Sequence, residues 1–302
     1  MKYRDINTVI LSRKDKELLR PSSGWLYKYL LDNNVAYFYA KRLGAKKRAV
    51  ENRVIREGDN YNRKFLKTLK LLGEVCKKNG VDYLVFKTLK YVPEVYAGDL
   101  DVIVKEKDFD RILEIFKKRG FFCKYEGKLK AGLVKTGYSK IESRVNVENH
   151  GIVLFESTEI WRYKEKAKLG GLDIYKTTKE FDLVCLLLNI LYGPKYLDLY
   201  LILLYKQVGR KRLLSFLKSK KLAEELKLLD SKLIAKDITD KRFPIFVPDL
   251  TYLDWWAKNV FLSNKVFFLE KFKVLAFFYY IKYKYLLFNN LHFAHRWLDT
   301  DL

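Results

Sequence analysis

The clearest structural signal in the chain is the stretch YAGDLDVIVKEKDFDRILEIFKKRGF, residues 96–121. Its β-branched run from Val102 to Val104 predicts a strand. Apolar residues then recur at helical spacing, at Phe109, Ile112, Leu113 and Phe116. Gly120 follows as a helix stop. The stretch therefore predicts a strand, a short turn and an amphipathic helix.

Two aspartates stand where this strand begins. Asp99 and Asp101 are separated by one residue, so on a strand they point to the same face, roughly 6.5 Å apart. Carboxylates this close repel each other unless a cation or a proton lies between them. The pair therefore requires a source of positive charge.

The composition favours a folded, strongly basic protein. The 302 residues include 49% hydrophobic and 16% aromatic residues, which supply a core and argue against wholesale disorder. This length allows one large domain or two to three smaller ones. The formal net charge is +24, and a field of that sign attracts polyanions, of which nucleic acid is the usual one. The alternative is a surface that is simply rich in solvated lysine.

The cysteines and the termini indicate a cytoplasmic location. Cys76, Cys123 and Cys185 lie far apart in apolar contexts and show no zinc-ligand spacing, as expected in a reducing compartment. The first twenty residues are charged throughout and lack the core of a signal peptide. The longest uncharged run of the aromatic C-terminal stretch, residues 274–281, is far shorter than the ~20 residues that span a bilayer. We therefore expect no transmembrane span.

The remaining pattern predicts an α+β fold. We expect a small mixed sheet with flanking helices, N-terminal helices before it and a helical C-terminal domain after it. The strands at 82–87, 100–104 and 143–149 should be neighbours in one sheet, and the chain beyond about 178 should be mostly helical. The expected parts are an N-terminal helical segment at 1–61, a core at 62–156 and a helical domain at 157–302.

A third carboxylate joins the aspartate pair in this scheme. In the alternating stretch SRVNVEN, Arg144, Asn146 and Glu148 share one face. Neighbouring strands would then aim Asp99, Asp101 and Glu148 at one point. Three clustered carboxylates need cations, and two magnesium ions that bridge substrate phosphates would supply them.

These motifs resemble the nucleotidyltransferases of the DNA polymerase β superfamily, in particular the branch with a helical C-terminal domain. The matching stretches are FKT at 86–88, GDLDVIV at 98–104, KKRGF at 117–121 and VENH at 147–150. More distant matches of pattern are LLDNNVAYFYAKRLG in the N-terminal part and YLDLYLILL at 196–204. The resemblance thus covers most of the chain, with its specific part at 84–150.

The resemblance implies a magnesium-dependent transfer of NMP from an NTP to a hydroxyl acceptor. Asp99 and Asp101 match the two metal-binding aspartates, and Glu148 takes the place where the family usually has a third aspartate. The family's glycine-containing motif appears here as Lys87-Thr88, which would contact the triphosphate. The net charge makes RNA, tRNA especially, the expected acceptor, while antibiotic and protein hydroxyls stay open.

A basic cluster around one helix start is the candidate nucleic-acid-binding surface: Lys206, Arg210, Lys211 and Arg212. Because Lys87-Thr88 lacks the glycine, one alternative is a catalytically silent nucleic-acid-binding protein that retains the fold. Another is a toxin-like transferase whose protein partner is an antitoxin.

Overall fold

The computed structural model describes residues 49–87, 99–149, 152–192, 196–197, 199–219 and 245–246. The described helices are α4 (Ala49–Asn79), α5 (Glu106–Lys118), α6 (Ser157–Ile160), the 3-10 turn η1 (Trp161–Tyr163), α7 (Lys179–Tyr192), α8 (Leu199–Val208) and α9 (Arg210–Ser219). The helices expected at about 24–45 lie outside the described residues. No helix in the described part of the chain is long and apolar enough to cross a membrane.

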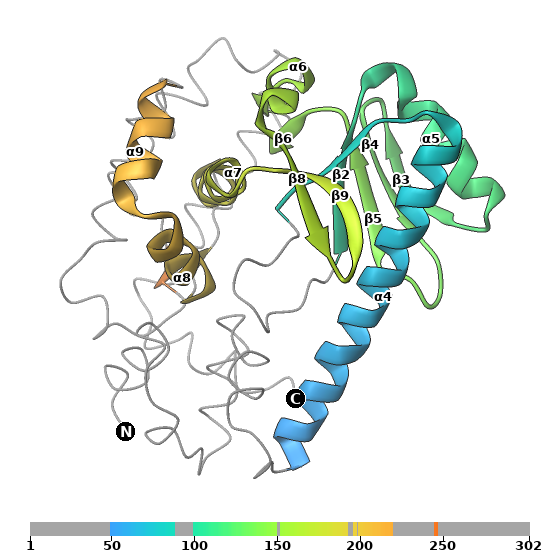
Figure 1. Cartoon of the computed structure of the whole chain (residues 1–302), viewed down its shortest axis with the longest axis horizontal. Coiled ribbons are helices and arrows are strands. Elements are labelled where there is room, and N and C mark those ends of the chain that lie inside the picture. The colour runs from blue at the N-terminus through green and yellow to red at the C-terminus, as the bar shows by residue number, and fades with distance from the viewer. Residues whose placement is uncertain are drawn as a thin grey trace, which may run out of the picture.

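A seven-stranded mixed sheet lies between helices α4 and α5 on one side and helix α7 on the other (Figure 1). Its strands, in spatial order, are β3 (Phe122–Gly127), β4 (Lys130–Val134), β5 (Lys140–Arg144), β2 (Asp99–Val104), β1 (Tyr83–Val85), β9 (Leu172–Thr177) and β8 (Lys164–Leu169). β2 pairs with β1 in antiparallel orientation and with β5 in parallel orientation. Two short antiparallel pairs lie outside this sheet: β6 (Val147–Asn149) with β7 (Ile152–Phe155), and β10 (Tyr196–Leu197) with β11 (Ile245–Phe246). The predicted α+β class is confirmed.

One face of the sheet is covered by α4 and α5, which Figure 1 shows together on one side of it. The apolar residues of β2 and β5 point to this side, where Leu100, Val102 and Ile141 join the main core. The helices contribute their apolar stripes to the same core, including Leu72 and Phe116, both with no exposed surface. This packing explains why the helical spacing of residues 106–118 was so clear.

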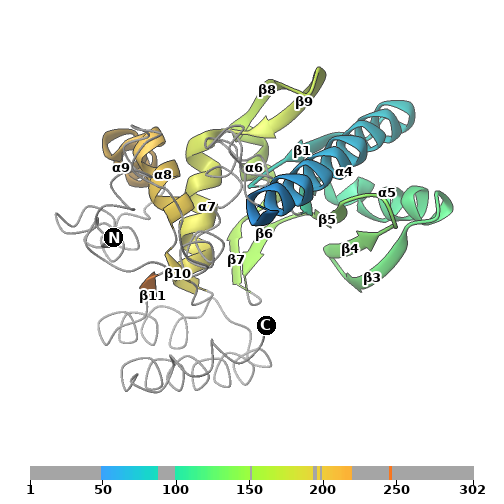
Figure 2. The ribbon, with the colours of Figure 1, turned by 90° about the horizontal axis from the view of Figure 1, so that it is seen from below.

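The other face of the sheet looks toward the helical half, where Figures 1 and 2 place α7, α8 and α9 on the side away from α4. Phe181 of α7 packs with Phe155 and Tyr163, at ring-centroid distances of 4.9 Å and 4.8 Å. Cys185 of α7 is buried, which raises its pKa, and it lies close enough to Lys87 and Asp101 for their charges to act on it. Helix α7 therefore stands next to the face that carries the aspartate pair.

The expected strand at 143–149 is not one strand, and that prediction is wrong. β5 ends at Arg144, the backbone bends at residues 145–146, and β6 begins at Val147 in a separate two-stranded sheet. The bend is fixed because Val145 donates its N–H to Leu129 O at 3.0 Å and Asn146 Oδ1 accepts the N–H of Ser157 at 2.9 Å. Period-two spacing continues through such a bend, so the sequence pattern does not reveal it.

The sheet also extends past residue 156, where the core was expected to end. The β8–β9 hairpin pairs with β1 through Val85 and Lys176 and so belongs to the same sheet. At the other boundary, α4 runs through residue 61 without interruption. Beyond residue 178 the described chain consists of α7, α8 and α9 with the small β10–β11 pair, as the helical pattern predicted.

Candidate functional site

A row of residues in register crosses four strands on the face toward α7. Asp101 on β2 is paired with Glu142 on β5, Glu142 with Gly132 on β4, and Gly132 with Tyr125 on β3. Residues paired across a sheet point to the same face, as do residues two apart on one strand. Asp99 therefore belongs to this face with Asp101, and three carboxylates from two neighbouring strands share it.

The cations that the carboxylates need come from β5 itself. Arg144, with 6% of its side chain exposed, donates to Asp101 Oδ1 at 3.2 Å and also to Glu142. Lys140 contacts Glu142 and lies 3.8 Å from Asp99. Because Lys140, Glu142 and Arg144 are two apart, the strand carries a plus-minus-plus row along the acidic pair. The protein thus supplies its own positive charge between the carboxylates.

The pKa values of Asp101 and Glu142, the two acids of the row, shift in opposite directions. Burial raises the pKa of Asp101, although Lys87 and Arg144 counteract it. Burial also acts on Glu142, but Lys140 and Arg144 outweigh it and hold the pKa at about 2. Glu142 is therefore the strongly stabilised anion of the pair, and Asp101 carries its charge at a cost.

Tyr125 extends the row to β3, because Gly132 on β4 leaves room for the Tyr125 ring. A Cβ at residue 132 would lie 2.4 Å from the Tyr125 ring. The ring therefore crosses β4 over bare backbone, and burial together with Glu142 raises the Tyr125 pKa. At position 132 the missing side chain is a packing requirement of the site.

Sequence reasoning missed Glu142 as the partner of Asp101. Glu148 lies on β6, outside the sheet that carries Asp101, and is not paired with it. It remains in the electrostatic surroundings, because Lys130 senses Glu142, Glu148 and Asp101 together while burial lowers the Lys130 pKa. The signal for Glu142 was present: it has the same parity as Arg144, Asn146 and Glu148, with Ile141 beside it facing the core.

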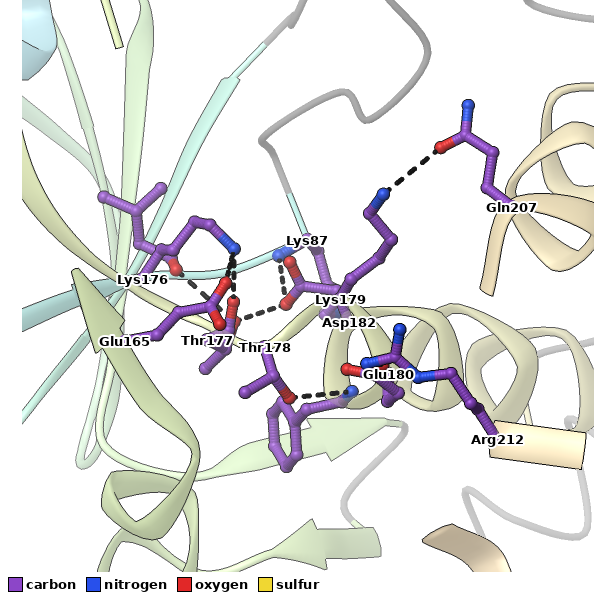
Figure 3. Close-up of polar contacts among 12 residues, drawn as sticks. Lys87, Glu165, Lys176, Thr177, Thr178, Lys179, Glu180, Asp182, Gln207 and Arg212 are labelled. Carbon is purple, nitrogen blue, oxygen red and sulfur yellow. Dashed lines mark hydrogen bonds and ion pairs between the residues drawn. The ribbon is translucent and has the colours of Figure 1, made fainter. Parts of the chain in front are cut away.

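The chain leaves β1 through a turn at Lys87. Lys87 has a φ of +56°, the one positive φ at a non-glycine position among the described residues. The side chain is buried, its Nζ lies 4.8 Å from the centre of the Phe86 ring, and its charge reaches Asp101. Its N–H donates to Asp182 Oδ1 on α7 at 3.0 Å (Figure 3). Thr88 lies outside the described residues.

The candidate nucleic-acid-binding residues lie on α8 and α9. Lys206 is exposed near the end of α8, and Arg210, Lys211 and Arg212 are exposed in the first turn of α9. Arg212 contacts Glu180 of α7, as Figure 3 shows. The cluster is thus a solvent-facing surface of the helical half.

The carboxylates of Asp99, Asp101 and Glu142 form an acidic row that suits magnesium. The contacts that these carboxylates now make would have to change before a metal could bind. Asp99, Asp101 and Glu142 offer the carboxylate oxygens that Mg²⁺ prefers. Within the described ranges, no three His, Cys, Asp or Glu side chains come together as a metal-binding group. Lys140 and Arg144 hold the oxygens that a metal would use. Metal binding here would require these two cations to give way.

No family model matches the sequence, and no curated protein matches it. Several solved structures are similar to this chain, and three of them have TM-scores of 0.32 to 0.33. The lincosamide antibiotic adenylyltransferase LnuA, solved with lincomycin bound, is 12% identical over 41% of this chain and 86% of its own. A Thermotoga maritima protein assigned as a nucleotidyltransferase is 16% identical over 54% and 92%, and an antigenic nucleotidyltransferase-like protein from Paracoccidioides brasiliensis is 13% identical over 55% and 90%. Likeness at these TM-scores carries no argument about this chain, so the roles of its residues must come from their own contacts.

Proposed function

We propose that the protein is a nucleotidyltransferase that moves NMP from an NTP to a hydroxyl acceptor. The observation that carries the proposal is the acidic row on one sheet face, Asp99, Asp101 and Glu142, beside the turn at Lys87. Glu142 replaces Glu148 as the third carboxylate, because it is paired with Asp101 in the sheet. In the reaction, the acceptor oxygen bonds to the α-phosphorus, the bond to pyrophosphate breaks, and the hydroxyl proton is released to water.

Asp99, Asp101 and Glu142 would hold the two magnesium ions. When bound, magnesium neutralises triphosphate charge and lowers the pKa of the attacking hydroxyl. The chain's own contribution is to fix the carboxylates: β2 and β5 hold them in register, and the core on the opposite face keeps both strands rigid. Lys87 and Thr88 would contact the triphosphate, with the Lys87 ammonium adding positive charge.

RNA, tRNA especially, is the acceptor that we propose. The support is the net charge of +24 and the exposed basic surface of Lys206, Arg210, Lys211 and Arg212. Binding through phosphates releases counterions, so the affinity for RNA should fall steeply as salt rises. An affinity that stays flat from 50 to 200 mM salt would favour a small-molecule acceptor instead.

The second candidate is a catalytically silent protein that binds nucleic acid and retains the fold. The contacts of Lys140 and Arg144 favour it, since internal cations already neutralise the carboxylates. A silent site of this kind has no need of metal. Such a protein would bind RNA with the same salt dependence but would neither transfer NMP nor respond to magnesium.

Incubating the purified 302-residue chain with each α-labelled NTP, magnesium and total RNA tests the proposal. We expect label to enter RNA from at least one NTP, with none transferred when a chelator replaces magnesium. Glu148→Gln is the matched control for Glu142→Gln: the first should keep activity and the second should lose it. Salt-dependent RNA binding without any transfer would instead support the silent alternative.

A further inference from the structure

The turn at Lys87 is held in a conformation that its side chain disfavours. A lysine at a φ of +56° is strained, whereas glycine takes this left-handed region freely. A non-glycine residue persists there only when its surroundings fix it, and such residues concentrate at functional sites. The structure must therefore contain a group that holds the Lys87 backbone.

That group is Asp182, in the first turn of α7. Its side chain is fully buried, and its Oδ1 accepts the Lys87 N–H at 3.0 Å as well as the hydroxyl of Thr177 (Figure 3). Thr177 is also fully buried and lies 3.4 Å from Val85 O, at the end of β1. One carboxylate oxygen thus joins the ends of β1 and β9 to α7.

The start of α7 is itself fixed, so Asp182 is not a loosely held side chain. Thr178 caps the helix by accepting the N–H of Phe181 at 3.4 Å, and its own N–H donates to Tyr163 O at 3.0 Å. Next to it, Lys176 contacts Glu165 and Thr177 O. Because α7 is fixed, the hydrogen bond from the Lys87 N–H to Asp182 restrains the backbone of Lys87.

We propose that Asp182 is a positioning residue for the nucleotide, holding the Lys87 turn in the left-handed form that the triphosphate needs. The inference rests on the proposed function, in which Lys87 and Thr88 contact the triphosphate. An acid near a helix start has a simpler structural explanation, favourable interaction with the helix dipole. That explanation requires no bond to Lys87 and predicts no effect on nucleotide affinity.

Dissociation constants for fluorescent analogues of the four NTPs, measured with magnesium, test the inference. Asp182→Ala should bind about ten-fold more weakly, the size expected when a single strained residue is released. Asp182→Asn keeps an acceptor oxygen for the Lys87 N–H, so it should bind within about three-fold of wild type. Thr177→Val is the matched control: it removes a different bond to the same oxygen, so it should lower the melting temperature and leave the dissociation constant unchanged.

Measuring Asp182→Ala in a Lys87→Gly background distinguishes a positioning role of Asp182 from a purely stabilising role. Glycine adopts a positive φ without strain, so in this background Asp182→Ala should weaken nucleotide binding by less than about two-fold. An equal loss in both backgrounds, or a folded Asp182→Ala variant with wild-type affinity, overturns the inference. If Asp182→Ala does not fold, Asp182→Asn and Asp182→Ser in the two backgrounds are compared by the same criterion. Wild type that binds no NTP overturns the proposed function, and the inference with it, whereas normal wild-type binding with unchanged variants overturns the inference alone.

Discussion

The two faces of β2 and β5 contrast sharply although they are made by alternate residues of the same strands. Toward α4 and α5, Leu100 and Ile141 are buried in an apolar core. Toward α7, Asp101 and Glu142 stand side by side with Arg144 between them. The apolar face holds the strands in register, and that register is what aligns the charges on the other face.

The contrast also separates stability from chemistry. Burial of apolar surface on the α4–α5 side contributes energy that holds these strands in place. On the charged face, two neighbouring cations stabilise the ionised form of Glu142, whereas burial disfavours the ionised form of Asp101. Substitutions on the two faces should therefore change the free energy of unfolding by different amounts, and at Asp101 the change should have the opposite sign.

Phe116→Ala should give the largest effect, because it removes a fully buried ring from the apolar face. The ring packs edge-to-face on Phe121 at a centroid distance of 5.0 Å. The expected loss in the free energy of unfolding is about 3–5 kcal/mol. Urea denaturation measures it, and a loss below about 1 kcal/mol would mean that this face does not carry the fold.

Glu142→Gln should cost about 3 kcal/mol at pH 7, since the pKa of Glu142 falls from 4.5 to about 2 on folding. A depressed pKa means that the contribution is complete above the unfolded-state value and is lost as pH falls through the folded one. The stability difference between wild type and variant should thus shrink between pH 4.5 and about 2. Denaturation at several pH values with a chelator present measures it, and a difference independent of pH would rule out the ion-pair explanation.

Gly132→Ala should give an intermediate loss of about 1–2 kcal/mol, because the new Cβ would lie 2.4 Å from the Tyr125 ring. Adding Tyr125→Ala should recover most of that loss relative to Tyr125→Ala alone. Thermal melting of the four proteins gives the coupling between the two positions. Additive effects would show that the ring does not cross β4 over Gly132.

Local periodicity was enough to predict much of the fold. The strand at Asp99–Val104, the helix at Glu106–Lys118 and the helical half follow from spacing within short windows. The β8–β9 hairpin was missed, although Gly170-Gly171 between two alternating runs is a hairpin signal, and both glycines have positive φ, 57° and 80°. Its lysine-rich edge strand does not look apolar enough to be recognised as part of a sheet.

The site could be predicted only in part. The aspartate pair was visible because both members belong to one strand, whereas Glu142 depends on which strand lies beside β2 and in what register. Asp182 was not distinguishable from any acid in the first turn of a helix, since its bond to Lys87 joins residues 95 apart in the chain. Contacts between residues so far apart in the chain depend on tertiary packing, and no local sequence pattern predicts them.

Asp101→Asn gives the most direct test of the claim that the charged face exists for metal-dependent transfer. Without metal the variant should be no less stable than wild type, because an amide of the same shape relieves a carboxylate whose pKa is raised by burial. Magnesium should raise the melting temperature of wild type alone, and transfer of NMP should be lost in the variant. If Asp101→Asn instead destabilises the protein at every magnesium concentration, and magnesium leaves wild-type melting unchanged, the aspartate pair is structural and the transferase account is contradicted.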